Sequence, residues 1–186
     1  MNPIKNKKNL EATVEDIRNF AHSYLQKYSP SKQQLRMYLF KKFIKIGQKK
    51  HTKKEVFDLI DSVILSLIEQ KFLNDQYYSN AKSKALLKKG YSLNKIRYNL
   101  IKKGIDEKFI QDSISKIKQD ESDPDFFSAI RVCKRRRIGP NREESNRTLF
   151  YKKDISILAR SGFSYEISKK VLSIPKEEFK KFCKML

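Results

Sequence analysis

Residues 92–110 read SLNKIRYNLIKKGIDEKFI, and this stretch predicts two short helices that meet at a glycine. Ile96 and Leu100 lie one helical turn apart, so they define an apolar stripe on a helix whose other positions are mostly polar. Ser92 is a residue type that caps the start of a helix. Gly104 is suited to end that helix, because glycine adopts the left-handed backbone of a helix C-terminus without steric penalty.

The same pattern recurs on both sides of this stretch. Downstream, residues 158–167 read LARSGFSYEI, and Gly162 stands 58 positions after Gly104. Upstream, residues 31–39 read SKQQLRMYL, which begins 61 positions before Ser92. A helical pattern that returns at nearly constant spacing indicates tandem units, each of which buries its apolar stripe within itself and against its neighbour.

Apolar residues recur at helical spacing along the rest of the chain, and glycine and proline are scarce at five each. Thr52 followed by Glu55 predicts a capping box, and Asp123 before Pro124 predicts another helix start. We therefore expect an all-α fold of three tandem three-helix repeats that form a curved, elongated helical stack. The expected parts are a basic N-terminal tail (1–12), helical repeat 1 (13–72) with a Lys-rich loop (45–54), helical repeat 2 (73–119), and helical repeat 3 with a C-terminal helix (120–186).

The composition is strongly basic. Lys and Arg number 42 against 21 Asp and Glu, which gives a formal net charge of +21. Such a charge predicts a polyanionic partner: nucleic acid, an acidic protein surface or an anionic membrane. The membrane is the least favoured of the three, since no long apolar run occurs and Trp is absent. The basic N-terminus lacks the apolar stretch of a secretory signal, and two cysteines without metal-type spacing fit free thiols, so we expect a cytoplasmic protein.

Two groups of basic residues are the candidate partner-binding or DNA-binding sites. Arginine suits paired contacts to phosphate or carboxylate, and a group of like charges repels itself unless a partner compensates. The alternative is that these residues are solvated helix ends that interact with the helix dipole. The first group is Arg131, Lys134, Arg135, Arg136, Arg137 and Arg142, and the second is Lys88, Lys89, Lys95, Arg97, Lys102 and Lys103.

Nothing in the sequence predicts an active site. Asp58 and Asp61 are the nearest pair to a carboxylate dyad, and they are better explained as the polar face of a helix. His22 and His51 have no ligand partner at helical spacing, and no Gly-rich phosphate loop or nucleophile elbow occurs. Cys133 is more plausible as a buried structural thiol than as a reactive one. We expect a protein that is not an enzyme, with no catalytic residue, metal site or cofactor.

Four segments together carry a resemblance to a known family. They are KFLNDQYY at residues 71–78, LIKKGID at 100–106, RRRIGPNR at 135–142 and DISILARSGFSY at 154–165. In this order and spacing, over about residues 15–172, the chain resembles the RecX family. It departs from the family in the Lys-rich insertion and in a weaker first repeat, which bear on the geometry of the N-terminal unit.

The resemblance implies a function. RecX proteins bind filaments of the recombinase RecA on single-stranded DNA and lower its ATP hydrolysis, strand exchange and coprotease activity. They thereby modulate recombination and the DNA-damage (SOS) response. We therefore expect a monomer whose partners are the RecA filament, the single-stranded DNA within it and, further, naked DNA. The alternative function is a basic helical DNA-binding protein that acts on nucleic acid without a recombinase partner.

Overall fold

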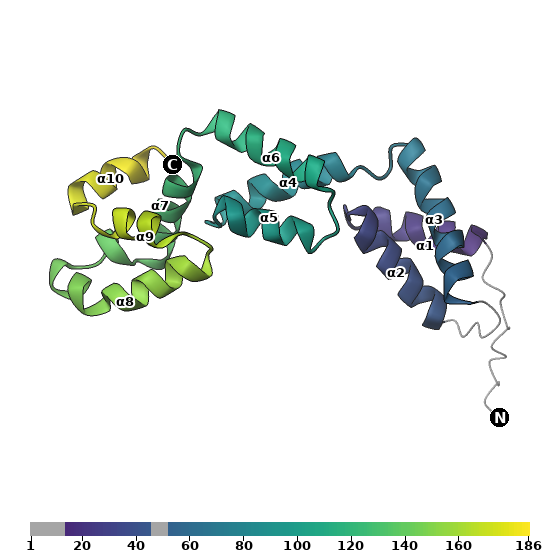
Figure 1. The fold of residues 1–186 in the computed structure, drawn as a ribbon, viewed down its shortest axis with the longest axis horizontal. Coiled ribbons are helices and arrows are strands. Elements are labelled where there is room, and N and C mark those ends of the chain that lie inside the picture. The colour runs from purple at the N-terminus through teal and green to yellow at the C-terminus, as the bar shows by residue number, and fades with distance from the viewer. Residues whose placement is uncertain (1–13, 46–51) are drawn as a thin grey trace, which may run out of the picture. The chain divides into compact units, whose positions relative to one another are not determined.

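The computed structural model describes residues 14–45 and 52–186 (Figure 1). Over these residues the chain forms ten α-helices, one short 3-10 helix and no strand, so the prediction of an all-helical protein is confirmed. The predicted basic tail (1–12) and most of the predicted Lys-rich loop (46–51) lie outside the described residues. The helices are α1 (Val14–Leu25), α2 (Lys32–Lys45), α3 (Lys53–Glu69), α4 (Asp75–Lys88), α5 (Leu93–Ile101), α6 (Glu107–Asp120), α7 (Pro124–Arg136), η1 (Gly139–Asn141), α8 (Glu144–Arg160), α9 (Tyr165–Leu172) and α10 (Lys176–Lys184).

The chain divides into two compact units, residues 1–75 and 76–186. In the first unit, α1, α2 and α3 enclose one apolar cluster, in which Leu35, Ile60 and Ile64 are completely buried. Burial of these side chains supplies the stabilisation that short helices lack on their own. The first unit is thus a three-helix body with its own core.

Local signals in the sequence set the helix starts of this first unit. Thr52 Oγ1 accepts the amide of Glu55 at 3.3 Å, and the Glu55 carboxylate accepts the amide of Thr52 at 2.8 Å. This reciprocal pair confirms the predicted capping box at the start of α3. Ser31 and Gln34 form the same kind of pair at the start of α2, with both distances at 3.2 Å.

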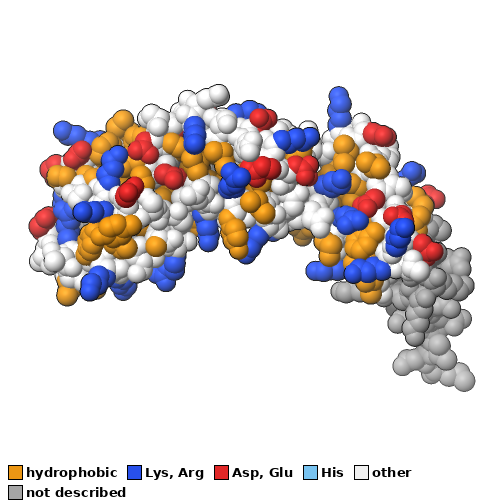
Figure 2. All heavy atoms as spheres, viewed as in Figure 1, with side chains coloured by type: hydrophobic (Ala, Val, Ile, Leu, Met, Phe, Trp, Pro, Cys, Tyr) orange, Lys and Arg blue, Asp and Glu red, His pale blue; other side chains and the backbone are white. Residues whose placement is uncertain are grey.

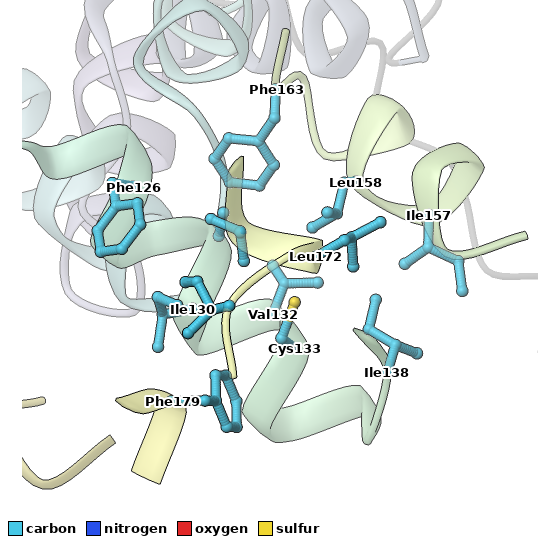
Figure 3. Close-up of a cluster of buried hydrophobic side chains, with 13 residues drawn as sticks. Phe126, Ile130, Val132, Cys133, Ile138, Ile157, Leu158, Phe163, Leu172 and Phe179 are labelled. Atoms are coloured by element: carbon cyan, nitrogen blue, oxygen red, sulfur yellow. The ribbon is translucent and has the colours of Figure 1, made fainter. Parts of the chain in front are cut away.

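The second unit contains two apolar clusters. Helices α4, α5 and α6 share the first, which is centred on Ile96, Leu100 and Ile110. Helices α7 to α10 share the second, whose side chains from four helices converge in Figure 3. The helix that follows α9 is therefore part of this core: Phe179 of α10 is buried in it, and Phe182 meets the Phe126 ring edge-on at a centroid distance of 5.1 Å.

Cys133 lies inside the second cluster of this unit and is completely buried. Burial raises the pKa of its thiol to about 12, because the thiolate would lose its hydration in apolar surroundings. A thiol with such a pKa stays protonated at neutral pH and is a poor nucleophile. The interpretation of Cys133 as a structural thiol agrees with this environment.

The two glycines at the centre of the repeated pattern end helices as the sequence predicts. Gly104 follows α5 with a φ of +70°, and Gly162 follows α8 with a φ of +94°. The run of basic residues from 131 to 142 is not one helix. Helix α7 ends at Arg136, Arg137 takes the left-handed conformation (φ +54°), and the chain then turns through η1.

Candidate partner-binding surface

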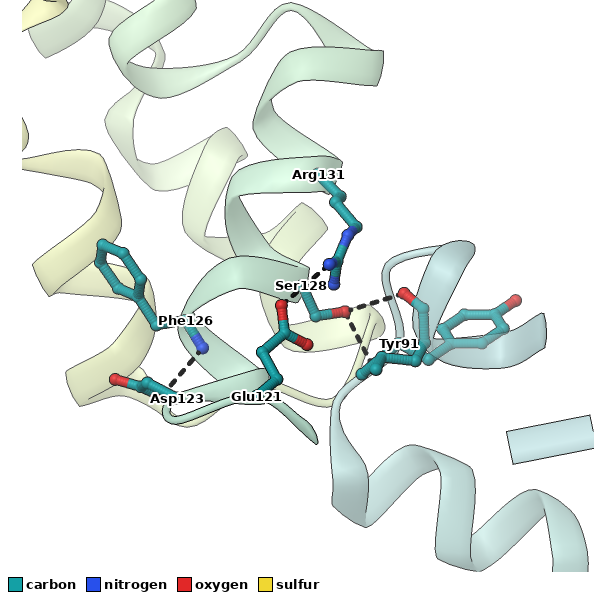
Figure 4. Close-up of polar contacts among 7 residues, drawn as sticks. Tyr91, Glu121, Asp123, Phe126, Ser128 and Arg131 are labelled. Atoms are coloured by element: carbon teal, nitrogen blue, oxygen red, sulfur yellow. Dashed lines mark hydrogen bonds and ion pairs between the residues drawn. The ribbon is translucent and has the colours of Figure 1, made fainter. Parts of the chain in front are cut away.

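The candidate residues of unit 76–186 are positioned by the junction between its two groups of helices. On one side of this junction, Ser128 of α7 donates its hydroxyl to the carbonyl oxygens of Leu87 (3.3 Å) and Tyr91 (3.0 Å). Figure 4 shows Ser128 beside Tyr91. Gly90 lies so close to α7 that a Cβ there would be 2.5 Å from Val132 Cγ2. The C-terminal end of α4 is therefore held directly against α7.

On the other side of the junction, the start of α5 is held by the turn between α8 and α9. Ser92 donates its amide to the Ser161 carbonyl at 3.1 Å and its hydroxyl to the Gly162 carbonyl at 2.7 Å. Asp125 of α7 accepts the amide of Leu93 at 2.7 Å. Partial burial raises the pKa of Asp125, although this hydrogen bond opposes the shift. These bonds fix α5 and α7 relative to each other.

Helix α5 carries the candidate residues Lys95 and Arg97, and Lys102 follows it directly. Tyr98 is half exposed, and the Lys102 ammonium lies 4.5 Å from the centre of its ring, with Lys95 at 5.7 Å. A hydrogen bond with Lys102 lowers the pKa of the Tyr98 hydroxyl. Arg97, in contrast, forms an ion pair of 2.6 Å with Glu107 on α6. The structure therefore brings Lys95 and Lys102 together around an aromatic ring and gives Arg97 an internal partner. Lys103 lies just beyond the end of α5.

Three candidate residues on α7 each bond to another part of unit 76–186. The Arg131 guanidinium pairs with Glu121 at 2.8 Å (Figure 4), Lys134 donates to the Cys183 carbonyl at 3.0 Å, and Arg135 donates to the Lys89 carbonyl at 2.7 Å. Together with Lys88 from the end of α4, these three side chains line a hollow of about 480 Å³. The hollow thus gathers cations from both groups of helices. Lys89, which follows Lys88 in the sequence, has an exposed side chain.

The remaining candidates occupy two different environments. Arg136 and Arg137 are exposed, and neither side chain has a hydrogen-bond or ion-pair partner among residues 14–45 and 52–186. Arg142 instead donates from Nε and Nη2 to the buried carboxylate of Asp154, both at 2.8 Å, and Asp154 also accepts the amide of Gly139 at 2.8 Å. The single arginine cluster suggested by the sequence is thus divided, and Arg142 stabilises the fold.

Helix α10 adds basic residues that the sequence reasoning missed. Lys134 also borders a second hollow, of about 440 Å³, between α7 and α10. The signal for these residues was the amphipathic stretch KEEFKKFCK, in which two phenylalanines three positions apart face the core. The lysines of α10 that line this second hollow are Lys176, Lys180, Lys181 and Lys184.

Basic side chains are spread over the face drawn in Figure 2, with carboxylates and apolar side chains among them. Within the described part of the chain, no three His, Cys, Asp or Glu side chains come together in a way that would hold a metal ion. Of the helices in residues 14–45 and 52–186, none is both long enough and apolar enough to cross a bilayer. The geometry that remains is a set of surface cations, some anchored by internal partners and some with unpaired head groups.

Comparison with curated proteins gives three similar sequences, each named regulatory protein RecX, whereas no protein-family model matches the chain. The chain is 29% identical over 164 residues to the Myxococcus xanthus protein, which covers 84% of this chain and 83% of that protein. It is 30% identical over 142 residues to the Clostridium tetani protein, and the match covers 71% of this chain and 63% of that protein. The match to the Clostridium perfringens protein is 28% over 109 residues and spans half of that protein.

Two solved structures share the fold. The crystal structure of RecX from Lactobacillus salivarius superposes with a TM-score of 0.61 at 19% identity, and the match covers 92% of this chain and 99% of that one. A second crystal structure of regulatory protein RecX gives a TM-score of 0.55 at 19% identity, and the match covers 91% of this chain and 78% of that one. At this identity the likeness supports a common helical fold.

Proposed function

We propose, from its similarity to proteins named regulatory protein RecX, that this chain belongs to the RecX family, binds RecA filaments on DNA and inhibits the recombinase, ATPase and coprotease activities of RecA. The observation that carries the proposal is the similarity to proteins named regulatory protein RecX, which extends over 83% of the Myxococcus xanthus relative. In this role the protein modulates recombination and the SOS response in the cytoplasm, as a monomer without enzymatic activity or a cofactor.

The proposed architecture is three tandem three-helix repeats, at residues 13–72, 73–119 and 120–186, which form a curved stack. Equivalent contacts in the first two repeats support it. Ser31 and Ser92, 61 positions apart, each accept a backbone amide at the start of the second helix of their repeat. Five positions after each serine, an arginine joins the second helix to the third, as Arg36 with Asp61 and as Arg97 with Glu107.

Within this proposal, the cations with unpaired or exposed head groups contact the filament. Their charge suits acidic protein surface and DNA phosphate, and guanidinium groups bind either by paired hydrogen bonds. The candidates with internal partners, such as Arg97, Arg131 and Arg142, hold the helices that present the others. The proposed contact residues are Lys89, Lys95, Lys102, Arg136 and Arg137, with Lys88, Lys103, Lys134 and Arg135 beside them.

Charge reversal at Arg136 and Arg137 tests this contact surface, because neither side chain has a partner whose loss would disturb the fold. A variant with Arg136→Glu and Arg137→Glu is expected to bind preformed RecA filaments at least about 10-fold more weakly, as each lost charge-assisted contact is typically worth that much or more. The matched control carries Lys152→Glu and Lys169→Glu on exposed positions of α8 and α9. Equal weakening by both variants would show that the arginines form no specific contact.

The alternative function is a basic helical protein that coats DNA without a recombinase partner, and the net charge of +21 favours it. Such a protein would bind bare single-stranded DNA as tightly as the filament, and its affinity would fall steeply with salt in proportion to the phosphates neutralised. A RecA regulator keeps a higher affinity for the filament than for bare DNA at the same salt concentration. Measuring both affinities at two salt concentrations separates the two functions.

A further inference from the structure

The hollow beside α7 concentrates positive charge in a small volume. Its lining consists of four cations and Leu186, so no acidic side chain lines it. Only Arg131 has an ion-pair partner among the described residues, and that partner is Glu121. With the carboxylate of Glu121 and the α-carboxylate of Leu186, the last residue of the sequence, the four cations leave a net charge of +2 around about 480 Å³. Like charges held this close repel one another, and a bound anion would relieve that repulsion.

The cations of the hollow are fixed in place yet keep most of their hydrogen-bond donors. Arg135 uses one N–H on the Lys89 carbonyl, and Lys134 uses one on the Cys183 carbonyl. An arginine has five N–H donors and a lysine has three. Four donors on Arg135 and two on Lys134 therefore have no acceptor among residues 14–45 and 52–186, while the two bonds already made hold the side chains in position.

Arg131 adds an unsatisfied donor next to these groups. Its Nη1 is buried without a hydrogen-bond partner, although Nη2 bonds to Glu121. A buried guanidinium N–H without an acceptor costs free energy, so an acceptor oxygen within hydrogen-bond distance of it would be stabilised. The hollow thus offers charge, oriented free donors and one donor that lacks an acceptor.

We propose that this hollow is a binding site for a compact polyphosphate group, meaning inorganic triphosphate or the phosphate chain of a nucleotide. A triphosphate carries about three to four negative charges within a few ångströms, so it can contact several cations of one hollow at once. A nucleic-acid backbone carries one charge per phosphate and spreads its charges along an extended strand. Because Lys88 comes from α4 and the other cations from α7, the ligand bridges the two groups of helices in unit 76–186.

Isothermal titration of the full-length protein with inorganic triphosphate tests the site. The native protein is expected to bind it, and a variant with Lys88→Gln and Lys134→Gln is expected to bind about 100-fold more weakly, at about 10-fold for each lost charge-assisted contact. A variant with Lys152→Gln and Lys169→Gln removes the same charge elsewhere and is expected to match the native protein. Melting temperatures of the three unliganded proteins confirm that all are folded.

Two further ligands identify the source of the phosphate and the rival occupant. Adenosine triphosphate that binds more tightly than inorganic triphosphate supports a nucleotide site, and equal affinities support recognition of the phosphate chain alone. Absent binding of triphosphate, or equal binding by both variants, would overturn the proposal. So would an oligothymidylate whose binding depends on Lys88 and Lys134 while triphosphate binding does not. This experiment needs no recombinase, so its outcome is independent of the function proposed above.

Discussion

Asp154 is a carboxylate buried to 1% exposure, and three N–H groups satisfy it: two from Arg142 and the amide of Gly139. Replacing Arg142 with alanine would leave this charge buried with one donor. We expect the variant to lose about 3 kcal/mol of unfolding free energy, the usual effect of breaking a buried ion pair from one side. Urea denaturation measures the loss. Arg136→Ala serves as the control, with a change within about 0.5 kcal/mol because its side chain is exposed.

The backbone of Arg137 has a positive φ, as does that of Gly90 at the end of α4. A residue with a Cβ is strained there by about 1 kcal/mol. Arg137→Gly should therefore stabilise the protein by up to about 1 kcal/mol in urea denaturation, while removing a cation from the proposed contact surface. A variant that is destabilised would contradict the assigned backbone strain.

The sequence could not distinguish these two arginines, because both belong to one run of basic residues. Arg142 was predicted to be a contact residue since its type and charge suit a surface site. Its acceptor, Asp154, is twelve positions away on another helix, and only the fold brings the two together. Residue type therefore predicted the basic character of the region but not which cations are internal.

At the scale of elements, Gly104 and Gly162 end equivalent helices but have different surroundings. Gly104 is exposed, whereas a Cβ on Gly162 would lie 2.5 Å from Ser92 Oγ and 2.6 Å from Lys95 Cβ. Gly104→Ala should cost about 1 kcal/mol through backbone strain alone. Gly162→Ala should cost about 3 kcal/mol, because overpacking at the helix junction adds to the strain. Equal losses in thermal or urea denaturation would argue against close packing at this junction.

The packing of α7 within its cluster gives a pH dependence. The pKa of Cys133 is about 12 in the folded protein and near 9 when exposed. The unfolded state therefore loses its thiol proton first as pH rises, so this group destabilises the fold progressively between pH 9 and 12 and has no effect below pH 9. Between pH 8 and 10.5, the native protein should lose more unfolding free energy than a Cys133→Ala variant does. Parallel losses in the two proteins would contradict burial of the thiol.

Helix periodicity and capping residues predicted most elements, because both signals are local. Thr52, Ser92 and Asp123 accept backbone amides at helix starts as expected. The sequence did not predict that α7 would end before Arg137, since the turn depends on the Gly139 contact with Asp154. Nor did it predict that α10 would bring its lysines beside Lys134, which depends on the packing of Phe179 and Phe182.

At the scale of the whole molecule, net charge and the similarity to RecX proteins support the same proposed function. A charge of +21 predicts a polyanionic partner but does not distinguish DNA from a DNA–protein filament. Similarity to proteins named regulatory protein RecX is the reason that we propose the filament, and the shared helical fold is consistent with that proposal. The partner itself leaves no local signature in the sequence, because a filament-binding surface requires no fixed motif.

The most direct test of RecA inhibition is to titrate RecA with this protein at near-physiological salt and to measure the rate of single-stranded-DNA-dependent ATP hydrolysis. We expect the native protein and the Lys152→Glu/Lys169→Glu control to lower the rate alike. The Arg136→Glu/Arg137→Glu variant should need at least about 10-fold more protein for the same inhibition. An unchanged hydrolysis rate at a modest excess of native protein that still binds bare DNA tightly would contradict the proposed inhibition of RecA.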